Sequence, residues 1–336
     1  FVKKKSNLSN YEKFLRSNYN YKSHKNYPKL LNWSLKNNKK FWNSIWDYTG
    51  INGIKNEKFK LSKNLIDSKF FINSKLNFSE NLLSKKNNNR AITFISENGY
   101  KEVRSWKDLN KNTIKIVKFL KSINLKKGQR IAGYMPNTIQ TVESFLASSA
   151  IGAIWSSCSP DFGVNGVIER FIQIRPSVLI ICDRYYYNGK EINVLERLSE
   201  IIKKIPSIKK VIIVNYPGKK YMNLNKIKSN KIYYWKDIPN TKADEISFEK
   251  FDFDHELAIL YSSGTTGKPK CICHRSGGVL LQHLKEHQLH CEIKPNDNVF
   301  YFTTCGWMMW NWLVTVLASK ASILLFDGFP MYKKPD

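Results

Sequence analysis

The chain has 336 residues and a mass of 39.3 kDa, and its 55 Lys and Arg against 27 Asp and Glu give a net charge of +28. Hydrophobic residues make up 42% and aromatic residues 13%, which is enough apolar side chain for a packed core, so a disordered or collagen-like chain is excluded. Six Cys without any CxxC pair do not fit a disulfide scaffold; they fit a reducing compartment, and we expect a cytoplasmic protein.

The positive charge is concentrated in the first two thirds of the chain. Residues 1–90 hold 20 Lys and Arg against 5 Asp and Glu, whereas residues 251–336 hold 8 of each. The Lys are scattered among Asn and Ser, without an RNA-binding aromatic motif or zinc-finger spacing. A basic module that binds nucleic acid non-specifically is one alternative. A compositional drift toward Lys and Asn is the simpler explanation, so we expect no specific nucleic-acid partner.

The first 89 residues are polar and rich in Lys and Asn, and residues 39–48 carry Phe, Trp, Ile and Tyr at helical spacing. They predict a small helical N-terminal region. From residue 90 onward, short apolar runs alternate with helical patterns. We expect strands at residues 91–95, 130–135, 153–157, 178–182, 210–214, 257–261, 299–302 and 322–326. We expect helices at residues 105–125, 138–151, 164–174, 192–205, 277–289 and 308–317. This alternation predicts an α/β fold with mostly parallel sheets that helices cover on both faces.

One uncharged segment, residues 298–319, is long enough to cross a membrane. Polar residues interrupt it, and Thr303-Thr304-Cys305-Gly306 divides it into a short strand-like run and a short helix-like run. We therefore expect a buried strand, loop and helix rather than a membrane span.

The most informative motif is Tyr261-Ser-Ser-Gly-Thr-Thr-Gly-Lys-Pro-Lys270, which follows an apolar strand. Its two Gly allow consecutive backbone N–H groups to face a ligand, its hydroxyls add donors, and its two Lys supply positive charge, so the motif predicts a polyphosphate site. It is not a Walker A loop, because Ser262 and Pro269 stand where that motif has Gly and Ser or Thr. A Ser- and Gly-rich surface turn is the alternative interpretation.

This run resembles the phosphate loop of the adenylate-forming superfamily of acyl-CoA synthetases, and His274-Arg-Ser-Gly-Gly278 matches the segment that follows the loop. Three more runs are similar to those of acetoacetyl-CoA synthetases rather than acetyl-CoA synthetases: Ser159-Pro-Asp-Phe-Gly-Val164, Leu280-Leu-Gln-His-Leu-Lys-Glu-His287 and Phe302-Thr-Thr-Cys-Gly-Trp-Met-Met-Trp-Asn311. The Trp-rich residues 41–48 are similar to a small N-terminal region that both kinds of synthetase share. The resemblance covers nearly the whole chain.

The resemblance implies an acid–thiol ligase with two half-reactions. Acetoacetate attacks the α-phosphate of ATP to give acetoacetyl-adenylate and pyrophosphate, and the CoA thiol then displaces AMP. Acetate or butyrate is the alternative acid. Mg²⁺ would bridge phosphate oxygens, with no metal ligand from protein side chains. The resemblance assigns the ATP phosphates to Ser262, Ser263, Gly264, Thr265, Thr266, Gly267, Lys268 and Lys270.

The resemblance also implies the positions of the other two substrates. Trp307, Met308 and Met309 would line the acyl pocket, although an ordinary apolar core is the alternative for this stretch. Lys190, Phe162 and Gly163 would lie near CoA, but Tyr187 stands where one basic residue of the family is expected, which weakens the inherited CoA contact.

The resemblance divides the chain into an N-terminal region, residues 1–89, and a partial adenylation domain, residues 90–336. The adenine loop, the ribose-binding segment and the small C-terminal domain with the adenylation Lys would lie beyond residue 336. We therefore expect an N-terminal part of a longer enzyme that is inactive on its own.

A competing motif, His283-Leu-Lys-Glu-His287, fits the H-x-x-E-H pattern of inverted zinc metalloproteases. His290, Cys291 and the upstream Cys271, Cys273 and His274 could add ligands. No third-ligand signature follows the pair, so we expect structural His on a helix face.

Overall fold

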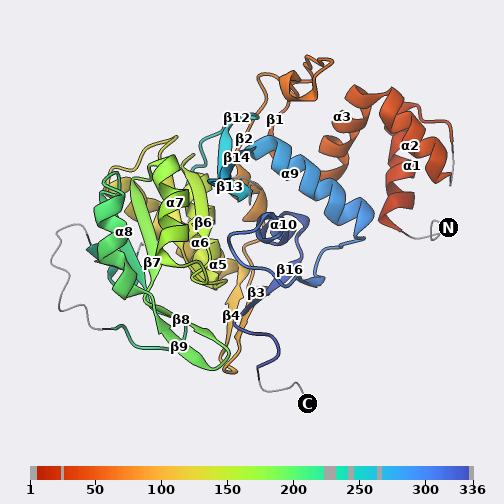
Figure 1. The fold of residues 1–336 in the computed structure, drawn as a ribbon. Helices are drawn as coiled ribbons and strands as arrows, with labels where there is room; N and C mark the ends of the chain where they lie inside the picture. The colour runs from red at the N-terminus through yellow and green to blue at the C-terminus, as the bar shows by residue number, and fades with distance from the viewer. Residues whose placement is uncertain (1–5, 24–25, 223–231, 241–245, 263–266, 333–336) are drawn as a thin grey trace.

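The computed structural model describes residues 6–23, 26–222, 232–240, 246–262 and 267–332. Its first part consists of the helices α1 (Asn7–Tyr19), α2 (Tyr27–Lys36) and α3 (Asn38–Thr49), which lie together at one end of the molecule (Figure 1). Ser6 and Asn26 accept backbone N–H groups at the starts of α1 and α2, which fixes where these helices begin. The predicted helix at residues 39–48 is confirmed within α3.

A small sheet joins this N-terminal part to the rest of the chain. Strands β1 (Gly53–Ile54) and β2 (Lys75–Leu76) pair with each other, and β2 pairs with β12 (Phe251–Asp252) from the middle of the sequence. The short 3₁₀ helix η1 (Leu65–Asp67) lies between β1 and β2, and α4 (Phe78–Leu82) follows β2. Residues 1–89 therefore contribute to a shared sheet as well as to helices.

The main sheet has seven strands in the order β11-β10-β7-β5-β6-β13-β14. All pairs are parallel except β13 with β14. The strands are β5 (Arg130–Tyr134), β6 (Ile154–Cys158), β7 (Val178–Cys182), β10 (Lys210–Val214), β11 (Ile232–Tyr234), β13 (Glu256–Ser262) and β14 (Lys270–Arg275). Because β6 and β7 lie on opposite sides of β5, right-handed crossovers place the helices after β5 and after β6 on opposite faces. The predicted α/β fold with mostly parallel, helix-covered sheets is confirmed.

Helices cover both faces of this sheet in pairs. On one face α5 (Trp106–Ser122) packs against α6 (Ile139–Ala150); on the other, α7 (Val164–Ile174) packs against α8 (Leu198–Lys204), as Figure 1 shows. All five residues of β7 are buried, which explains why this strand is apolar throughout.

A second sheet of four strands has the order β15-β16-β3-β4. Its strands are β3 (Arg90–Ser96), β4 (Lys101–Ser105), β15 (Asn298–Phe300) and β16 (Ser322–Asp327). β16 lies parallel to both β15 and β3, whereas β3 and β4 form an antiparallel hairpin. The strand β3 thus pairs with a segment more than 200 residues later in the sequence.

The remaining elements are a hairpin, β8 (Arg184–Tyr187) with β9 (Lys190–Asn193), the 3₁₀ helices η2 (Leu195–Arg197), η3 (Trp235–Asp237) and η5 (Val316–Ser319), the helices α9 (Ser276–Lys285) and α10 (Met308–Thr315), and a π-helical turn, η4 (Glu286–His290). None of the helices described is long and apolar enough to cross a membrane. The uncharged segment at residues 298–319 instead forms β15, a loop, α10 and η5, as the sequence predicts.

Several predicted boundaries are wrong. The helix expected at residues 105–125 ends at Ser122. The helix expected at residues 192–205 begins later, because Ile192 pairs with Tyr185 in the β8–β9 hairpin and the side chain of Asn193 accepts the backbone N–H of Leu195. The helix expected at residues 277–289 changes to a π-helical turn after Lys285. The strand expected at residues 299–302 ends at Phe300, where its pairing with β16 also ends.

Candidate adenylate-forming site

The predicted phosphate loop lies at the carboxyl edge of the main sheet. It connects the end of β13 to the start of β14, and Ser262 pairs with Lys270 across its base. β5, β6, β7 and β10 end at the same edge, since they lie parallel to β13 in one sheet. Ligands of open α/β sheets bind in the crevice at this edge, so the location fits a ligand site.

The structure describes only the two sides of the predicted loop. Ser262 is the last residue of β13, and Gly267, Lys268 and Lys270 are exposed on the returning side. Gly267 has a φ of 115°, which L side chains rarely adopt, and no atom lies within 4 Å of where a Cβ would be. Ser263, Gly264, Thr265 and Thr266 lie outside the described residues.

The base of the loop is attached to β6 and α7. The hydroxyl of Ser156 donates to the Ile259 carbonyl at 2.8 Å and lies 3.0 Å from the Tyr261 hydroxyl. On the other side of the loop, Gln173 Nε2 donates to the Pro269 carbonyl at 3.0 Å. Burial raises the pKa of Tyr261, so this tyrosine stays neutral. Both sides of the loop are therefore fixed to the sheet and to a helix that covers it.

The β6–α7 connection, which contains Phe162 and Gly163, lies beside the loop. The guanidinium of Arg170 lies 4.3 Å from the centre of the Phe162 ring and 5.9 Å from that of Tyr261, so it links the two segments. The Phe162 carbonyl accepts the Tyr134 hydroxyl at 2.7 Å and Arg197 at 3.2 Å. Gly163 precedes α7 and has open space around it.

Residues 303–309 reach the same edge from the second sheet. Ser157 donates through its hydroxyl to the Cys305 carbonyl, and the Cys305 thiol donates to the Met135 carbonyl at 2.7 Å. A Cβ on Gly306 would lie 3.6 Å from the Ser157 carbonyl oxygen and 3.7 Å from the Phe162 ring. The phosphate loop, the Phe162 connection and the start of α10 therefore converge.

A groove of about 870 Å³ lies between α9 and α10, and we call it the α9–α10 groove. Met308, Met309 and Trp312 line it from α10, and Val279 and His283 line it from α9. Its volume is in the range of small-molecule sites. Trp307, the residue before α10, is 66% exposed and is not among the residues that line this groove.

The two His of the HxxEH motif pack α9 and the π-helical turn η4 against α10. His283 Nδ1 lies 3.0 Å from the Thr315 hydroxyl, and the His287 ring lies edge-on to Trp312 with centroids 4.6 Å apart. Burial lowers the pKa of His283 to about 4 and that of His287 to about 3, so both are neutral at pH 7. Glu286 pairs with Lys285 instead. Within the described part of the chain, no group of three or more His, Cys, Asp or Glu could hold a metal ion.

The family described as AMP-binding enzyme matches residues 80–336. The chain belongs to this AMP-binding family. The acetoacetyl-CoA synthetase of Gallus gallus is 41% identical over 320 residues, which are 93% of this chain and 48% of that protein. The Rhizobium meliloti acetoacetyl-coenzyme A synthetase is 39% identical over 310 residues, 92% of this chain and 47% of that protein.

A solved structure agrees with these relatives. The acetoacetyl-CoA synthetase from Streptomyces lividans superposes with a TM-score of 0.91 at 29% identity, over 98% of this chain and 50% of that one. A malonamoyl-CoA synthetase of Penicillium aethiopicum is 34% identical over 331 residues, 92% of this chain and 44% of that protein. The chain spans about half the length of the curated relatives it matches. The superfamily that the motifs indicate is confirmed.

The predicted CoA residue Lys190 lies on the β8–β9 hairpin. Lys190 starts β9, pairs with Tyr187 across the hairpin and is exposed. The hairpin turn is attached to Glu97, whose carboxylate accepts the backbone N–H groups of Asn188 and Gly189 at 2.9 and 2.8 Å. No contact described links Lys190 to Phe162 or Gly163. The assignment of these three residues to CoA therefore stays a prediction.

Two polar residues that sequence reasoning missed, the buried Asn137 and the half-buried Asp327, link the segments around the site. Asn137 Nδ2 donates to the carbonyls of Thr303 and Phe326, and its Oδ1 accepts Trp310 Nε1 at 2.9 Å. Asp327 accepts the Asn137 backbone N–H at 3.1 Å and the Tyr216 hydroxyl at 2.9 Å. In the sequence, Asn137 follows an apolar strand and Asp327 ends one, but this pattern does not show that the two residues are in contact.

Proposed function

We propose that this chain contributes the phosphate loop and the acid-binding groove to an ATP-dependent acetoacetate–CoA ligase. The carboxylate of acetoacetate attacks the α-phosphorus of ATP, a new C–O–P linkage forms, and pyrophosphate leaves. The CoA sulfur then attacks the acyl carbon, and AMP leaves with the carboxylate oxygen that joined it. The observation that carries this proposal is the place of the loop at the carboxyl edge of the main sheet, where Ser156 and Gln173 hold its two sides. The 41% identity to an acetoacetyl-CoA synthetase over 93% of the chain supports the choice of reaction.

The loop binds phosphate and stabilises charge; it supplies no nucleophile. Lys268 and Lys270 are exposed at the carboxyl edge, where they offset the negative charge that develops on the leaving pyrophosphate. Mg²⁺ enters with ATP as part of the substrate, because polyphosphate oxygens are the ligands that it prefers. The hydroxyls assigned by the resemblance would help to orient this substrate.

The α9–α10 groove suits a short β-keto acid. Its Met308, Met309 and Trp312 walls present apolar surface to the terminal methyl group. His274 also lines the groove, and its Nδ1 is buried without a hydrogen-bond partner. Burial lowers the pKa of His274, so the ring is neutral at pH 7 and can donate one hydrogen bond to a keto oxygen. Acetate has no such oxygen, and butyrate carries CH₂ in its place.

Malonamate is the strongest competing acid, because one relative is a malonamoyl-CoA synthetase. It has the length of acetoacetate but ends in an amide nitrogen instead of a methyl group. An amide N–H₂ placed against Met and Trp side chains loses hydrogen bonds to water, so the described walls favour acetoacetate. We also propose that Phe162, Gly163 and Lys190 face CoA, and that the reaction takes place in the cytoplasm.

The test is acid-dependent exchange of labelled pyrophosphate into ATP by the complete protein, since the adenylate half-reaction runs alone without CoA. We expect fast exchange with acetoacetate and slow exchange with malonamate, acetate and butyrate. If another of these acids drove the exchange, that acid would be the substrate, and the proposed adenylation reaction would still stand. The absence of exchange with every acid, from folded complete protein, would refute the proposed function.

A further inference from the structure

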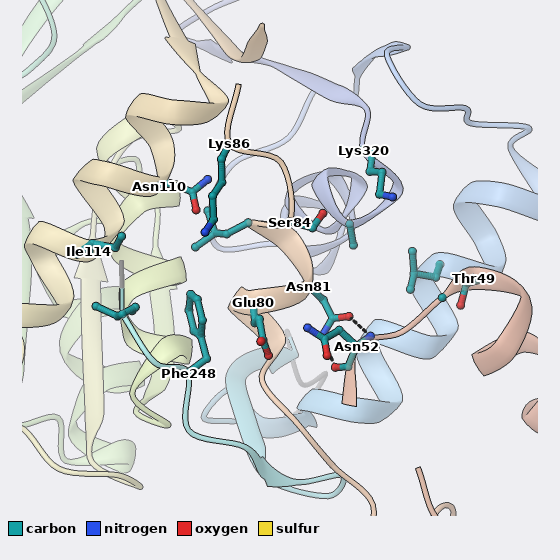
Figure 2. A pocket seen from close by; sticks show the side chains of 15 residues that line it. Thr49, Asn52, Glu80, Asn81, Ser84, Lys86, Asn110, Ile114, Phe248 and Lys320 are labelled. Atoms are coloured by element: carbon teal, nitrogen blue, oxygen red, sulfur yellow. Dashed lines mark hydrogen bonds between the residues drawn. The ribbon is translucent and has the colours of Figure 1, made fainter. Parts of the chain in front are cut away.

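A second cavity lies away from the adenylate-forming site, where the N-terminal part of the chain meets α5, α9 and η5 (Figure 2). Its volume is about 450 Å³, and none of its lining residues also lines the α9–α10 groove. We call it the junction cavity. Segments far apart in the sequence form it, from the end of α3 to η5. Its volume is within the range of sites for small ligands.

The junction cavity has an apolar side and a polar side. Figure 2 shows Ile114 and Phe248 together on one side, and Lys320 with Thr49 on the opposite side. In the same view Lys86 lies beside Asn110 and above Phe248. A ligand that fills the cavity would therefore contact both hydrocarbon and ammonium groups.

Some of the polar side chains around the cavity already form hydrogen bonds or ion pairs with other residues of the protein. Glu80, the acidic residue among those that line it, already forms an ion pair with Lys250. Asn110 uses its Nδ2 for the carbonyls of Lys85 and Trp106, at 2.8 and 2.9 Å. Its Oδ1 has no such bond among the described contacts.

Lys320 carries the charge that is available to a ligand. Its carbonyl accepts the Nζ of Lys85 at 3.3 Å, but Lys85 itself does not line the cavity. Within the part of the chain that the structure describes, the Nζ of Lys320 has no acidic partner. The exposed hydroxyl of Ser84 lines the same cavity. An ammonium group and a hydroxyl are typical donors for a carboxylate or phosphate group.

We propose that the junction cavity binds a small organic anion, with its acid group on the Lys320 and Ser84 side and its apolar body against Ile114 and Phe248. The anion is a carboxylate or a phosphate monoester, since the same donors serve both groups. Neutral molecules of the same shape bind more weakly, because they leave the ammonium group without a counter-charge.

This site is separate from the proposed acid-binding groove, although α9 takes part in both. Leu284 lines the junction cavity, whereas its neighbour His283 lines the α9–α10 groove. Ala318, just beyond α10, lines the junction cavity as well. A ligand in the junction cavity would thus contact α9 through Leu284 and η5 through Ala318, and it does not compete with a substrate for space.

The test is isothermal titration of the complete protein with pentanoate and with n-butyl phosphate, beside the neutral analogues pentanamide and 1-pentanol. We expect saturable binding of at least one anion and much weaker binding of both neutral analogues. Lys320→Gln should weaken anion binding about tenfold by removing a charged hydrogen bond. The matched control is Lys121→Gln on the exposed face of α5, which should leave binding unchanged.

A second pair of variants locates the binding. Ser84→Phe fills the cavity from an exposed position and should abolish binding, whereas Met309→Trp narrows the α9–α10 groove and should not affect it. Circular dichroism checks that each variant is folded. If Ser84→Phe does not fold, Lys320→Gln still tests whether the anion binds in the junction cavity. The proposal would be overturned if no probe bound saturably or if neutral and anionic probes bound equally well. It would also be overturned if Lys320→Gln kept the full anion affinity, or if Met309→Trp alone lost anion binding. Because these titrations contain no ATP or CoA, their outcome is independent of the proposed ligase activity.

Discussion

Replacing Asn137 with Ala should destabilise the protein more than most single polar substitutions do. Asn137 is 3% exposed, and its side chain makes three hydrogen bonds, to the Thr303 and Phe326 carbonyls and from Trp310 Nε1. Each bond contributes about 1 kcal/mol, and the buried partners are left unpaired after the substitution. The expected loss in the free energy of unfolding is therefore about 3 kcal/mol. The backbone N–H of residue 137 keeps its bond to Asp327.

Urea unfolding followed by tryptophan fluorescence measures this loss. The matched control is Asn165→Ala, at an exposed position of α7, which should change stability by only a few tenths of a kcal/mol because Ala is the better helix former. A loss below about 1 kcal/mol for Asn137→Ala would refute the reasoning, since it would show that the three bonds do not hold the start of α10 to the two sheets.

Three further predictions concern charge. In the complete protein, Lys268→Ala should slow acetoacetate-dependent pyrophosphate–ATP exchange about a hundredfold, and an unchanged rate would show that Lys268 does not face the phosphates. Burial raises the pKa of Asp327 to about 7, so the folded form binds the proton more tightly than the unfolded chain. The free energy of unfolding should therefore fall as the pH rises from about 4 to 7. In urea titrations at different pH, Asp327→Asn should make this fall smaller. Burial lowers the pKa of His287 to about 3, so stability should fall as the pH drops below about 6.5, and parallel curves for His287→Phe and wild type would contradict this.

The central strands could be predicted because burial on both faces leaves a simple signal. Strand β7 is apolar throughout and β10 is apolar after Lys210, and the bounds of both strands match the expectation. The β8–β9 hairpin gives no such signal, because its strands mix the charged residues Lys, Glu and Arg with the buried Tyr185 and Tyr186. The strand order could not be predicted from the sequence either, because β3 pairs with β16, a strand more than 200 residues later in the chain.

The candidate site was predictable only where one segment carries the chemistry. The phosphate loop combines Gly, hydroxyls and Lys within ten residues, so local sequence suffices to identify it. The α9–α10 groove combines His274 with Trp312, and their proximity depends on how two helices pack. The side chain of Asn137 is buried because Thr303, Phe326 and Trp310 satisfy it, and a sequence pattern does not reveal such distant partners.

The most direct test of the central claim is transfer of oxygen from the acid to AMP. The complete protein is given acetoacetate with ¹⁸O in its carboxylate, ATP and CoA, and mass spectrometry follows the label in the products. Attack of the carboxylate on the α-phosphorus predicts acetoacetyl-CoA, pyrophosphate and AMP that carries one ¹⁸O. Label in inorganic phosphate together with ADP, or acetoacetyl-CoA formed without labelled AMP, would contradict an adenylate intermediate.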